Sequence, residues 1–352
     1  SIRFFLSLSD RGQIARTRRD VFSFEICMNI LIPGGLGLIG HNVVGLLERD
    51  HHCTIIDNRT NYGRIPQDEL DYLMNERLDR IITRDIWVRD ITDGAAIPHI
   101  MAATKPEVVV HLASFPRQPV VNANPQWGAQ VMMEGLLNLL EHAVKNNVRR
   151  FVYVSSSMVY GEFQDDVRED ANCRPQGQYG IMKLAGEWLV RDYTRRRGME
   201  HVILRPSAVY GPLDVADRVI SQFLITAMQG GTLYVNGEHE TLDFTYVHDA
   251  AQGIANAALL PQAANRTFNI TKSHSKTILA AAELAVQLAG SGRIAVRDRH
   301  QDYPSRGSLN IDAAREYLNF DPQVSIEQGF RIYHDWLQNS VFWAPKTIRR
   351  PA

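Results

Sequence analysis

A glycine-rich turn between an apolar run and a helical pattern is the feature that most constrains the fold of this chain. Residues 29–32 form the apolar run, and Gly34, Gly37 and Gly40 follow it with the spacing G-x-x-G-x-x-G, before a helical pattern that extends to Asp50. Glycine permits a tight turn and lets backbone N–H groups approach a phosphate at the start of a helix. Strand, turn and helix in this order predict a dinucleotide site, and a glycine-rich turn without a ligand is the less favoured alternative.

An acidic residue ends the next apolar run. Residues 53–56 read as a second strand, and Asp57 follows it, 17 residues after Gly40. At about this separation a carboxylate binds the hydroxyls of an adenosine ribose. Because such a carboxylate repels a 2′-phosphate, the pattern favours NAD over NADP. Arg59 keeps NADP open as an alternative, and Asp57 could instead be a turn residue ahead of Asn58.

The following segments alternate between strand and helix patterns. Apolar runs at 81–88, 108–113 and 151–154 read as strands, residues 130–144 read as a helix, and residues 114–125, with three prolines, read as a loop. This alternation predicts an α/β fold with a Rossmann-like, doubly wound parallel sheet. Ligands of such sheets lie at the carboxyl ends of the strands.

Composition argues against several classes of partner. The 352-residue chain has a net charge of −1, so nothing points to nucleic acid or to an anionic membrane. No apolar run approaches the roughly 20 residues that cross a bilayer. Cys27, Cys53 and Cys173 have neither metal-ligand nor disulfide spacing, so we expect no metal and a reducing, cytoplasmic compartment. Residues 1–27 differ from the rest of the chain and read as an N-terminal extension without an assigned function.

A tyrosine and a lysine four residues apart are the clearest candidates for chemistry. On a helix, Tyr179 and Lys183 lie on one face, one turn apart. An ammonium near a phenol lowers the pKa of the tyrosine, which could then exchange a proton with an alcohol. Residues 155–157 are serines that follow a strand, and one hydroxyl could bind the same substrate oxygen. Without further context, a Tyr-x-x-x-Lys pattern is more often an ordinary surface helix.

The context comes from a set of motifs in a fixed order. Over about residues 28–340 the chain resembles the extended short-chain dehydrogenase/reductase family, in its NAD-dependent epimerase/dehydratase branch, and in particular the nucleotide-sugar 4-epimerases. The resemblance is carried by Gly34-x-x-Gly37-x-x-Gly40, Asp57-Asn58, Asp90-Ile91, His111-Leu112-Ala113, the Ser-Ser-Ser-Met-Val-Tyr-Gly stretch at 155–161, Tyr179-x-x-x-Lys183, Leu204-Arg205-Pro206-Ser207-Ala208-Val209-Tyr210-Gly211-Pro212, the stretch 243–249 and the stretch 318–322.

The resemblance implies a division of the chain and a set of roles. An NAD-binding Rossmann domain would cover 28–205, with 246–272 returning to it, and a smaller C-terminal α/β substrate-binding lobe would comprise 206–245 and 273–345. Tyr179 would be the base, Ser156 the catalytic serine and Lys183 the residue that holds the nicotinamide ribose. The glycines would face the pyrophosphate, Asp57 the ribose, and Asp90 with Ile91 the adenine. The implied cofactor contacts are Gly34, Gly37, Leu38, Ile39, Asp57, Asn58, Asp90, Ile91, Leu112, Ala113, Tyr179, Lys183 and Pro206.

Some positions depart from the family pattern. Many dehydratases carry Asp-Glu after the catalytic residue, where this chain has Ser157 and Met158, so 4,6-dehydration is disfavoured. The 4-epimerases usually carry Asn where this chain has Ala208, and often Arg where it has Leu242, and the helix after the fourth strand often has Asn where Met132 stands. The cofactor half of the resemblance is therefore better supported than the nucleotide-sugar half.

Four residues are candidates for substrate contacts. Ser156 and Ser157 follow the fifth strand, and Arg117 and Arg306 could bind the phosphates of a nucleotide sugar. Arg306 could equally be a solvated surface arginine, and the case for Arg117 is weaker still.

Three functions fit these residues. The leading hypothesis is an NAD-dependent epimerase of a nucleotide sugar or related sugar, which oxidises its substrate transiently to a ketone and returns the hydride to the other face. The alternative is a net dehydrogenase or ketoreductase of a sugar derivative or a non-sugar alcohol, and a third, less favoured, is an NAD-binding redox sensor. A homodimer through helices at 130–144 and 179–193 is expected from the family. Their apolar residues could equally be buried within one chain; they include Met133, Leu137, Leu140, Leu184 and Leu189.

Overall fold

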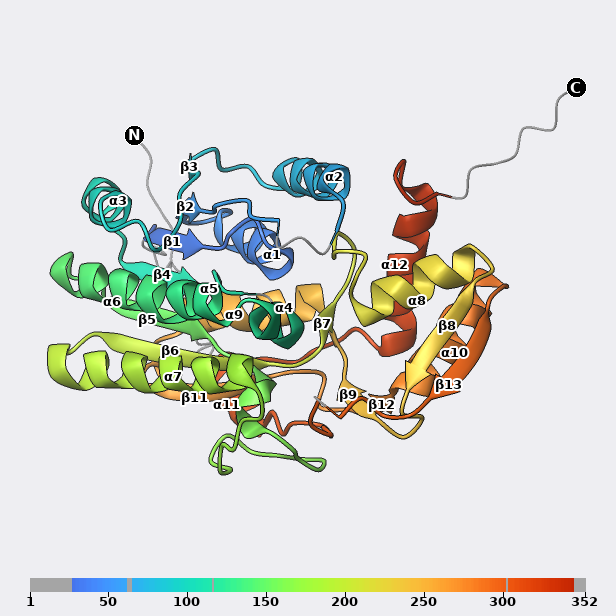
Figure 1. Cartoon of the computed structure of the whole chain (residues 1–352). Coiled ribbons are helices and arrows are strands. Elements are labelled where there is room, and N and C mark those ends of the chain that lie inside the picture. The colour runs from blue at the N-terminus through green and yellow to red at the C-terminus, as the bar shows by residue number, and fades with distance from the viewer. Residues whose placement is uncertain (1–26, 62–64, 116, 302, 345–352) are drawn as a thin grey trace, which may run out of the picture.

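A seven-stranded parallel sheet forms the centre of the larger part of the molecule (Figure 1). The computed structural model describes residues 27–61, 65–115, 117–301 and 303–344. The strand order is β11-β6-β5-β4-β1-β2-β3, and every neighbouring pair is parallel. The strands are β1 Asn29–Pro33, β2 His52–Ile56, β3 Ile86–Trp87, β4 Val108–His111, β5 Arg150–Val154, β6 Glu200–Pro206 and β11 Arg266–Ile270. The predicted doubly wound α/β fold is confirmed.

The order of the strands creates a crevice at one edge of the sheet. The chain moves outward from β1 through β2 to β3 and then crosses back to β4 on the other side of β1. The loops after β1 and β4 therefore diverge, and ligands bind at this point in open parallel sheets.

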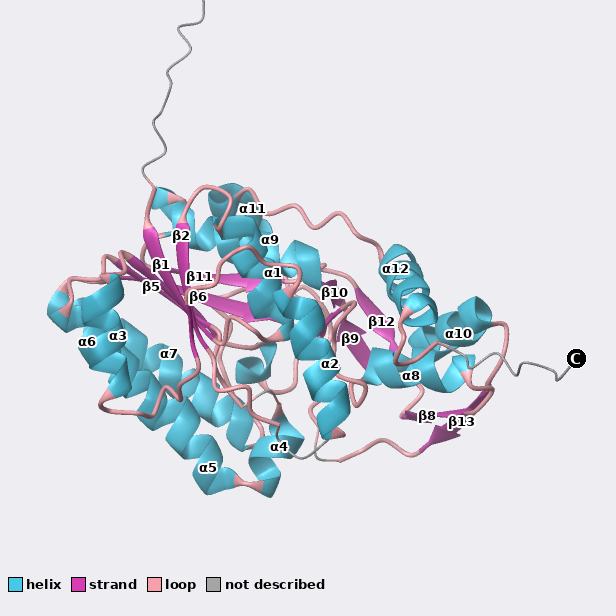
Figure 2. Cartoon of the chain, turned by 90° about the horizontal axis from the view of Figure 1, so that it is seen from above, coloured by secondary structure: helices cyan, strands magenta, loops and turns pink. Residues whose placement is uncertain are grey.

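Helices cover both faces of the sheet (Figure 2). One face is covered by α1 Leu38–Leu47, α9 Val247–Leu259 and α11 Asp312–Leu318, whose buried side chains form one core with the strands. The other face is covered by α3 Ala96–Thr104, α6 Gly135–Lys145 and α7 Gln178–Arg197, which contribute to a second core. β1, the glycine turn and α1 follow one another along the chain in the order that the sequence predicts. The helix α2 Gln67–Leu78 follows β2.

The smaller lobe is built from short sheets and three helices. Two strand pairs support it, β8 Thr232–Asn236 with β13 Arg293–Arg297 and β9 Thr241–Asp243 with β12 Ser275–Thr277. The helices α8 Val219–Met228, α10 Ile278–Ala289 and α12 Ile326–Asn339 pack around a separate core. The strand β7 Val209–Tyr210 pairs with β10 Thr245–Tyr246 where the chain passes between the two parts. Short 3₁₀ helices span Ser157–Tyr160 and Pro261–Ala263. The domain boundaries remain a prediction, but α9 and β11 of the expected return segment do join the large sheet.

Two sequence-based expectations differ from the structure. The strand expected at 81–88 is only two residues long, since β3 is an edge strand and Ile82 is 78% exposed. The expected loop at 114–125 contains two short helices, α4 Gln118–Ala123 and α5 Pro125–Ala129, followed by a π-helical turn Gln130–Glu134 ahead of α6. Proline lies in the first turn of both helices, where its missing N–H costs nothing.

Residues 1–26 of the predicted extension lie outside the described residues. Within the described ranges, every helix is too short or too polar to cross a membrane. In the same part of the chain, no three His, Cys, Asp or Glu side chains group so as to hold a metal ion.

Candidate active site

A cavity of about 770 Å³ lies between the carboxyl edge of the large sheet and the smaller lobe. The glycine turn, the ends of β2, β4, β5 and β6, and segments of the smaller lobe all contribute to its wall. All of the predicted cofactor, catalytic and substrate residues line it except Asp90. Predicted residues as much as 272 positions apart, Gly34 and Arg306, therefore meet at one site.

The glycine turn forms a cradle in which Gly34 and Gly40 occupy positions that admit only glycine. Gly34 has φ +82°, and a Cβ on it would overlap the backbone of Ala113. A Cβ on Gly40 would overlap the carbonyl oxygen of Gly34. Gly37 precedes α1, and a Cβ there would meet only the Gly34 oxygen, at 3.3 Å. The backbone at the start of α1 is thus accessible from the cavity, as a pyrophosphate requires.

Asp57 is held in place at the end of β2. Its carboxylate accepts hydrogen bonds from the backbone N–H groups of Leu36 (3.0 Å) and Arg59 (2.8 Å). Burial raises the pKa of Asp57, and these two hydrogen bonds oppose the rise. Arg59 is exposed and, among the described residues, does not belong to the cavity wall. The geometry suits a ribose with free hydroxyls and therefore NAD.

Asp90 does not take the place expected from the sequence. Its carboxylate accepts from the Asn58 amide at 2.8 Å and from the backbone N–H and hydroxyl of Thr92. These bonds turn it towards Asn58, which lines the cavity, while Asp90 does not. Ile91 does line the wall, so the adenine contact stays a prediction for Ile91, and Asp90 instead orients Asn58.

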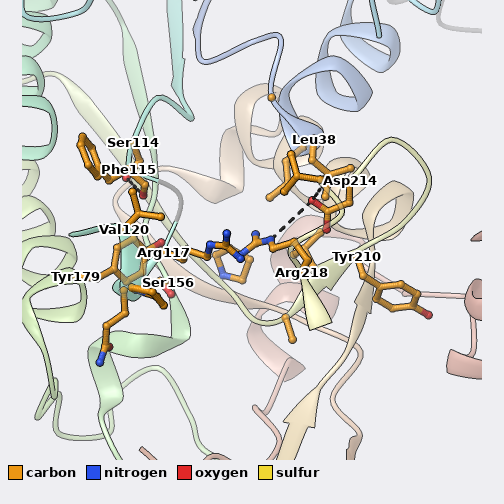
Figure 3. A pocket seen from close by; sticks show the side chains of 18 of the residues that line it. Leu38, Ser114, Phe115, Arg117, Val120, Ser156, Tyr179, Tyr210, Asp214 and Arg218 are labelled. Atoms are coloured by element: carbon orange, nitrogen blue, oxygen red, sulfur yellow. Dashed lines mark hydrogen bonds and ion pairs between the residues drawn. The ribbon is translucent and has the colours of Figure 1, made fainter. Parts of the chain in front are cut away.

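The three catalytic candidates lie together. Tyr179 stands in the first turn of α7 and lies on the same side of the cavity as Ser156. The Oγ of Ser156 accepts from the backbone N–H of Met158 at 3.2 Å, which fixes the start of the 3₁₀ helix. The Nζ of Lys183 donates to the carbonyl oxygen of Val154 at 2.8 Å and lies 5.9 Å from the Tyr179 ring centroid. Figure 3 shows Tyr179 and Ser156 on one side of the pocket and Leu38 on the other.

The electrostatics of this group differ from the sequence-based expectation. Burial raises the pKa of Tyr179, and the opposing influences are the charge of Arg218 and the hydrogen bond with Ser156. Burial also lowers the pKa of Lys183 to about 7, with Glu187 opposing the fall. The expectation that Lys183 brings the pKa of Tyr179 towards neutral is therefore wrong for the protein without cofactor, because the lysine itself is desolvated.

The buried lysine predicts a pH-dependent stability. Between about pH 7 and 10.5, the unfolded chain binds a proton at Lys183 that the folded chain has lost. The free energy of unfolding of the wild type should therefore rise with pH relative to Lys183→Met, by at most about 1.4 kcal/mol per pH unit. Urea denaturation of both proteins, from below neutral pH to about pH 9, measures this difference. A difference that stays constant across that range would contradict the assignment.

Arg306 is half-buried in the wall of the cavity, with its Nε fully covered. Its Nη1 lies 3.3 Å from the sulfur of Met158, and its buried Nε has no hydrogen-bond partner among the described residues. Burial lowers the pKa of Arg306 to about 10. No carboxylate within the described ranges forms an ion pair with it, so an anionic ligand would supply the missing acceptors.

The other substrate candidates have protein partners. Arg117 forms an ion pair with Asp217. The Oγ of Ser157 donates to the Oγ of Ser207 at 3.1 Å. Leu242 is buried in the core of the smaller lobe but still reaches the cavity wall. Ala208 has φ +37°, a left-handed conformation that Asn adopts more readily than Ala.

A buried charged network behind the site was not predicted from the sequence. The carboxylate of Glu187 is fully buried and accepts from Ser155 (2.7 Å) and from Arg205 Nε (2.9 Å) and Nη2 (2.7 Å). Arg205 in turn donates to the hydroxyl of Tyr160 at 2.8 Å. The signal was available, since Glu187 lies four residues after Lys183 on the same helix face.

Comparison with known proteins places these features in a family. The family model "NAD dependent epimerase/dehydratase family" matches residues 30–271. The chain is 27% identical over 314 residues to an uncharacterized UDP-glucose epimerase, YtcB, of Bacillus subtilis, covering 86% of this chain and 95% of the relative. It is 28% identical over 331 residues to a dTDP-glucose 4,6-dehydratase of Streptomyces niveus, covering 90% and 95%.

A solved structure agrees over most of its length. The UDP-glucuronic acid 4-epimerase of Bacillus cereus, in complex with UDP-glucuronic acid and NAD, superposes with a TM-score of 0.80 at 25% identity, covering 88% of this chain and 98% of that one. The glycine cradle, the Asp57 carboxylate and the Ser156–Tyr179–Lys183 group fit NAD, which is the cofactor of the family. The chain belongs to the NAD dependent epimerase/dehydratase family.

Proposed function

We propose that the protein is an NAD-dependent epimerase of a nucleotide sugar, which inverts a hydroxyl-bearing carbon through a transient ketone. One observation carries the proposal: Ser156, Tyr179 and Lys183 meet in a cavity whose opposite wall is the glycine cradle and whose smaller lobe presents Arg306. The relatives and the solved structure named above act on or bind UDP- or dTDP-sugars, which supports a nucleotide sugar as substrate.

The residues divide the work of proton transfer. Bound NAD supplies the hydride acceptor and donor. Ser156 holds the substrate oxygen, and Tyr179 removes the hydroxyl proton as the carbon becomes a carbonyl. After the ketone has turned over in the cavity, Tyr179 returns the same proton to the oxygen, so the reaction is redox-neutral. Lys183 lies on the ribose side of the site, as the family resemblance implies, and does not by itself lower the pKa of Tyr179 in the protein without cofactor.

Arg306 supports the proposal that the substrate carries a nucleoside diphosphate. Its guanidinium is buried and has no ion pair within the described residues, and it lies on the same wall as Met158. A diphosphate matches such a group because two phosphate oxygens accept from the planar fork together. Arg306 thereby takes over the role that the resemblance implies for the arginine which 4-epimerases often carry where this chain has Leu242.

The same site supports two other reactions less well. Ser157 and Met158 stand where dehydratases carry acids, and neither can act as the acid or base for loss of water. A dehydratase relative has similar identity, so dehydration is a competing outcome in the assay. Ala208 and Leu242 favour the second candidate, a net dehydrogenase or ketoreductase on a substrate without a diphosphate.

One experiment separates these functions. The protein as purified is incubated with UDP-, dTDP-, GDP- and CDP-sugars without added cofactor, and products are followed by NMR while the absorbance of reduced nicotinamide is recorded. We expect an epimer and a flat absorbance. Continuous change in absorbance would establish the dehydrogenase, a 4-keto-6-deoxy product the dehydratase, and no turnover on any sugar would reject the proposal.

We also propose a homodimer through α6 and α7. On α7, Ile181 is 52% and Trp188 is 64% exposed, and Leu137 on α6 is 37% exposed. Leu140, by contrast, is fully buried within the monomer. Ile181 and Trp188 are seven residues apart and therefore lie on one face of α7, and exposed apolar side chains that gather on one face can form an interaction surface. The free thiols of Cys27, Cys53 and Cys173 support a reducing, cytoplasmic location as part of the same proposal.

A charge on this face should dissociate the dimer. Trp188→Glu places a carboxylate where the partner helix would pack, and burying an unpaired charge there costs more than the contact provides. Size-exclusion chromatography with light scattering should give a dimer for the wild type and a monomer for the variant. Ile332→Glu is the control, because Ile332 is 44% exposed on α12, in the other part of the molecule. Equal masses for the wild type and Trp188→Glu would contradict this interface.

A further inference from the structure

The segment 211–218, between β7 and α8, is tied to the cofactor-binding part of the molecule. From α2, the buried Arg77 donates to the carbonyl oxygen of Leu213 at 2.7 Å and to that of Leu36, in the glycine turn, at 3.0 Å. Glu69 on the same helix accepts from the backbone N–H of Ala216 at 2.7 Å. One helix thus joins this segment to the cradle for the pyrophosphate.

The second connection comes from the opposite side of the crevice. Arg117, in the loop after β4, forms an ion pair with Asp217 and donates to its carbonyl oxygen at 3.0 Å. The two side chains are only 17% and 13% exposed. In Figure 3 the Arg117 side chain extends across the pocket from the side of Tyr179 and Ser156 towards that of Leu38. The pair therefore bridges the crevice in which the dinucleotide must lie.

Arg218 has donors available for a ligand. It is the last residue before α8, and its Nε lies 3.8 Å from the nearest carboxylate oxygen, that of Asp214. This exceeds a hydrogen-bond distance, and the Arg218 side chain makes no hydrogen bond among the described residues. It lines the cavity, and Figure 3 shows it pointing towards Arg117, next to Asp214 and Leu38, the first residue of α1.

These contacts place Arg218 beside the N-terminus of α1, at the end of a segment that is tied to α2 on one side and to the loop after β4 on the other. A planar guanidinium with open donors binds phosphate oxygens in pairs. The helix N-terminus opposite provides backbone N–H groups for the same anion. A dinucleotide between them would be enclosed by the Arg117–Asp217 bridge.

We propose that the segment 211–218 is a clasp that retains NAD: Arg218 contacts the pyrophosphate, and the Arg117–Asp217 bridge must open before the cofactor can leave. The inference rests on the proposed function, since a redox-neutral epimerase has no need to exchange its cofactor, whereas a net dehydrogenase must release it in every cycle.

The pyrophosphate contact is tested with ligands that differ in this group. Binding of ADP-ribose and of adenosine to the full chain freed of NAD is measured by calorimetry for the wild type and Arg218→Gln. Loss of a charge-assisted contact should weaken the affinity for ADP-ribose by about 10–100-fold and leave the affinity for adenosine unchanged. Arg89→Gln is the control, because it removes the same charge elsewhere on the cavity wall and should change the affinities for both ligands equally. An equal effect of Arg218→Gln on both ligands would overturn the contact.

The bridge is tested by the release of NAD from the holoenzyme. Asp217→Asn and Arg117→Gln remove the two charges of the bridge in turn. The holoenzyme carries the cofactor in its reduced form, and its dissociation is followed by the fluorescence of the reduced nicotinamide after a chase with excess ADP-ribose. We expect release about 10-fold faster or more in both variants, with unchanged circular dichroism. Unchanged release rates would reject the clasp. No sugar is present in either assay, so these outcomes do not depend on whether epimerisation is found.

Discussion

Tyr179→Phe should lower kcat for epimerisation by about 10²–10⁴-fold, the range that a positioned acid–base group contributes, while the affinity for NAD changes little. The ring keeps its place at the start of α7, so only the hydroxyl that meets Ser156 is lost. Because the proton must leave and return through this one oxygen, the loss should appear in kcat rather than in KM. Steady-state kinetics and NAD calorimetry on the same preparation measure both quantities.

The matched control is a second phenol near the same lysine. Tyr153 on β5 lies with its ring centroid 5.3 Å from the Nζ of Lys183, and its hydroxyl is 3.4 Å from the Lys183 carbonyl oxygen. It is buried behind the site and, in the described part of the chain, is not part of the cavity wall. Tyr153→Phe should therefore leave kcat within a few-fold of the wild type. If both substitutions reduced kcat alike, the loss would reflect packing around Lys183 and not proton transfer.

Glu187→Leu should cost about 3–5 kcal/mol of the free energy of unfolding, because it leaves the guanidinium of Arg205 buried without a counter-charge. Both side chains are at most 3% exposed, and two of the hydrogen bonds between them measure 2.9 and 2.7 Å. Urea denaturation measures the loss. The same change removes the acceptor of Ser155, which precedes the catalytic Ser156.

The double variant Glu187→Leu with Arg205→Met tests the physical cause. Replacing both members of a buried ion pair by apolar groups removes the unpaired charge, so it should be more stable than Glu187→Leu alone. Asp192→Ala is the control on the same helix. Because Asp192 pairs with exposed arginines, this substitution should lower the free energy of unfolding much less. A double variant as unstable as the sum of the two single variants would mean that packing, and not charge, dominates at this position.

Local patterns predicted much of the fold because they involve contiguous residues. Strand, glycine turn and helix follow one another at 29–47, and the segment 246–272 was expected to return to the main sheet, which it does through β11. Tyr179 and Lys183 needed only the periodicity of one helix to be placed together. The strand expected at 81–88 was predicted too long and the helices within 118–129 were missed, because both depend on neighbours that a local pattern does not contain.

Local motifs predicted most of the cavity residues but not all of them. Sixteen of the seventeen predicted site residues line the cavity, and most of them belong to motifs at the end of a strand or the start of a helix, whereas Arg306 lies between β13 and α11. Arg218 and Arg77 belong to no such motif, and they were found only through the segments that they touch.

By itself the sequence determined the βαβ order, the glycines that form the cradle, the acid at the end of β2 and the spacing of Tyr179 and Lys183, because each is fixed by backbone geometry over a few residues. The tertiary structure decided the direction of the Tyr179 pKa, the partner of Asp90, the burial of Arg306 and the bridge from Arg117 to Asp217. These depend on desolvation and on contacts between segments as much as 148 residues apart, such as Met158 and Arg306, and both arise only when the chain has packed.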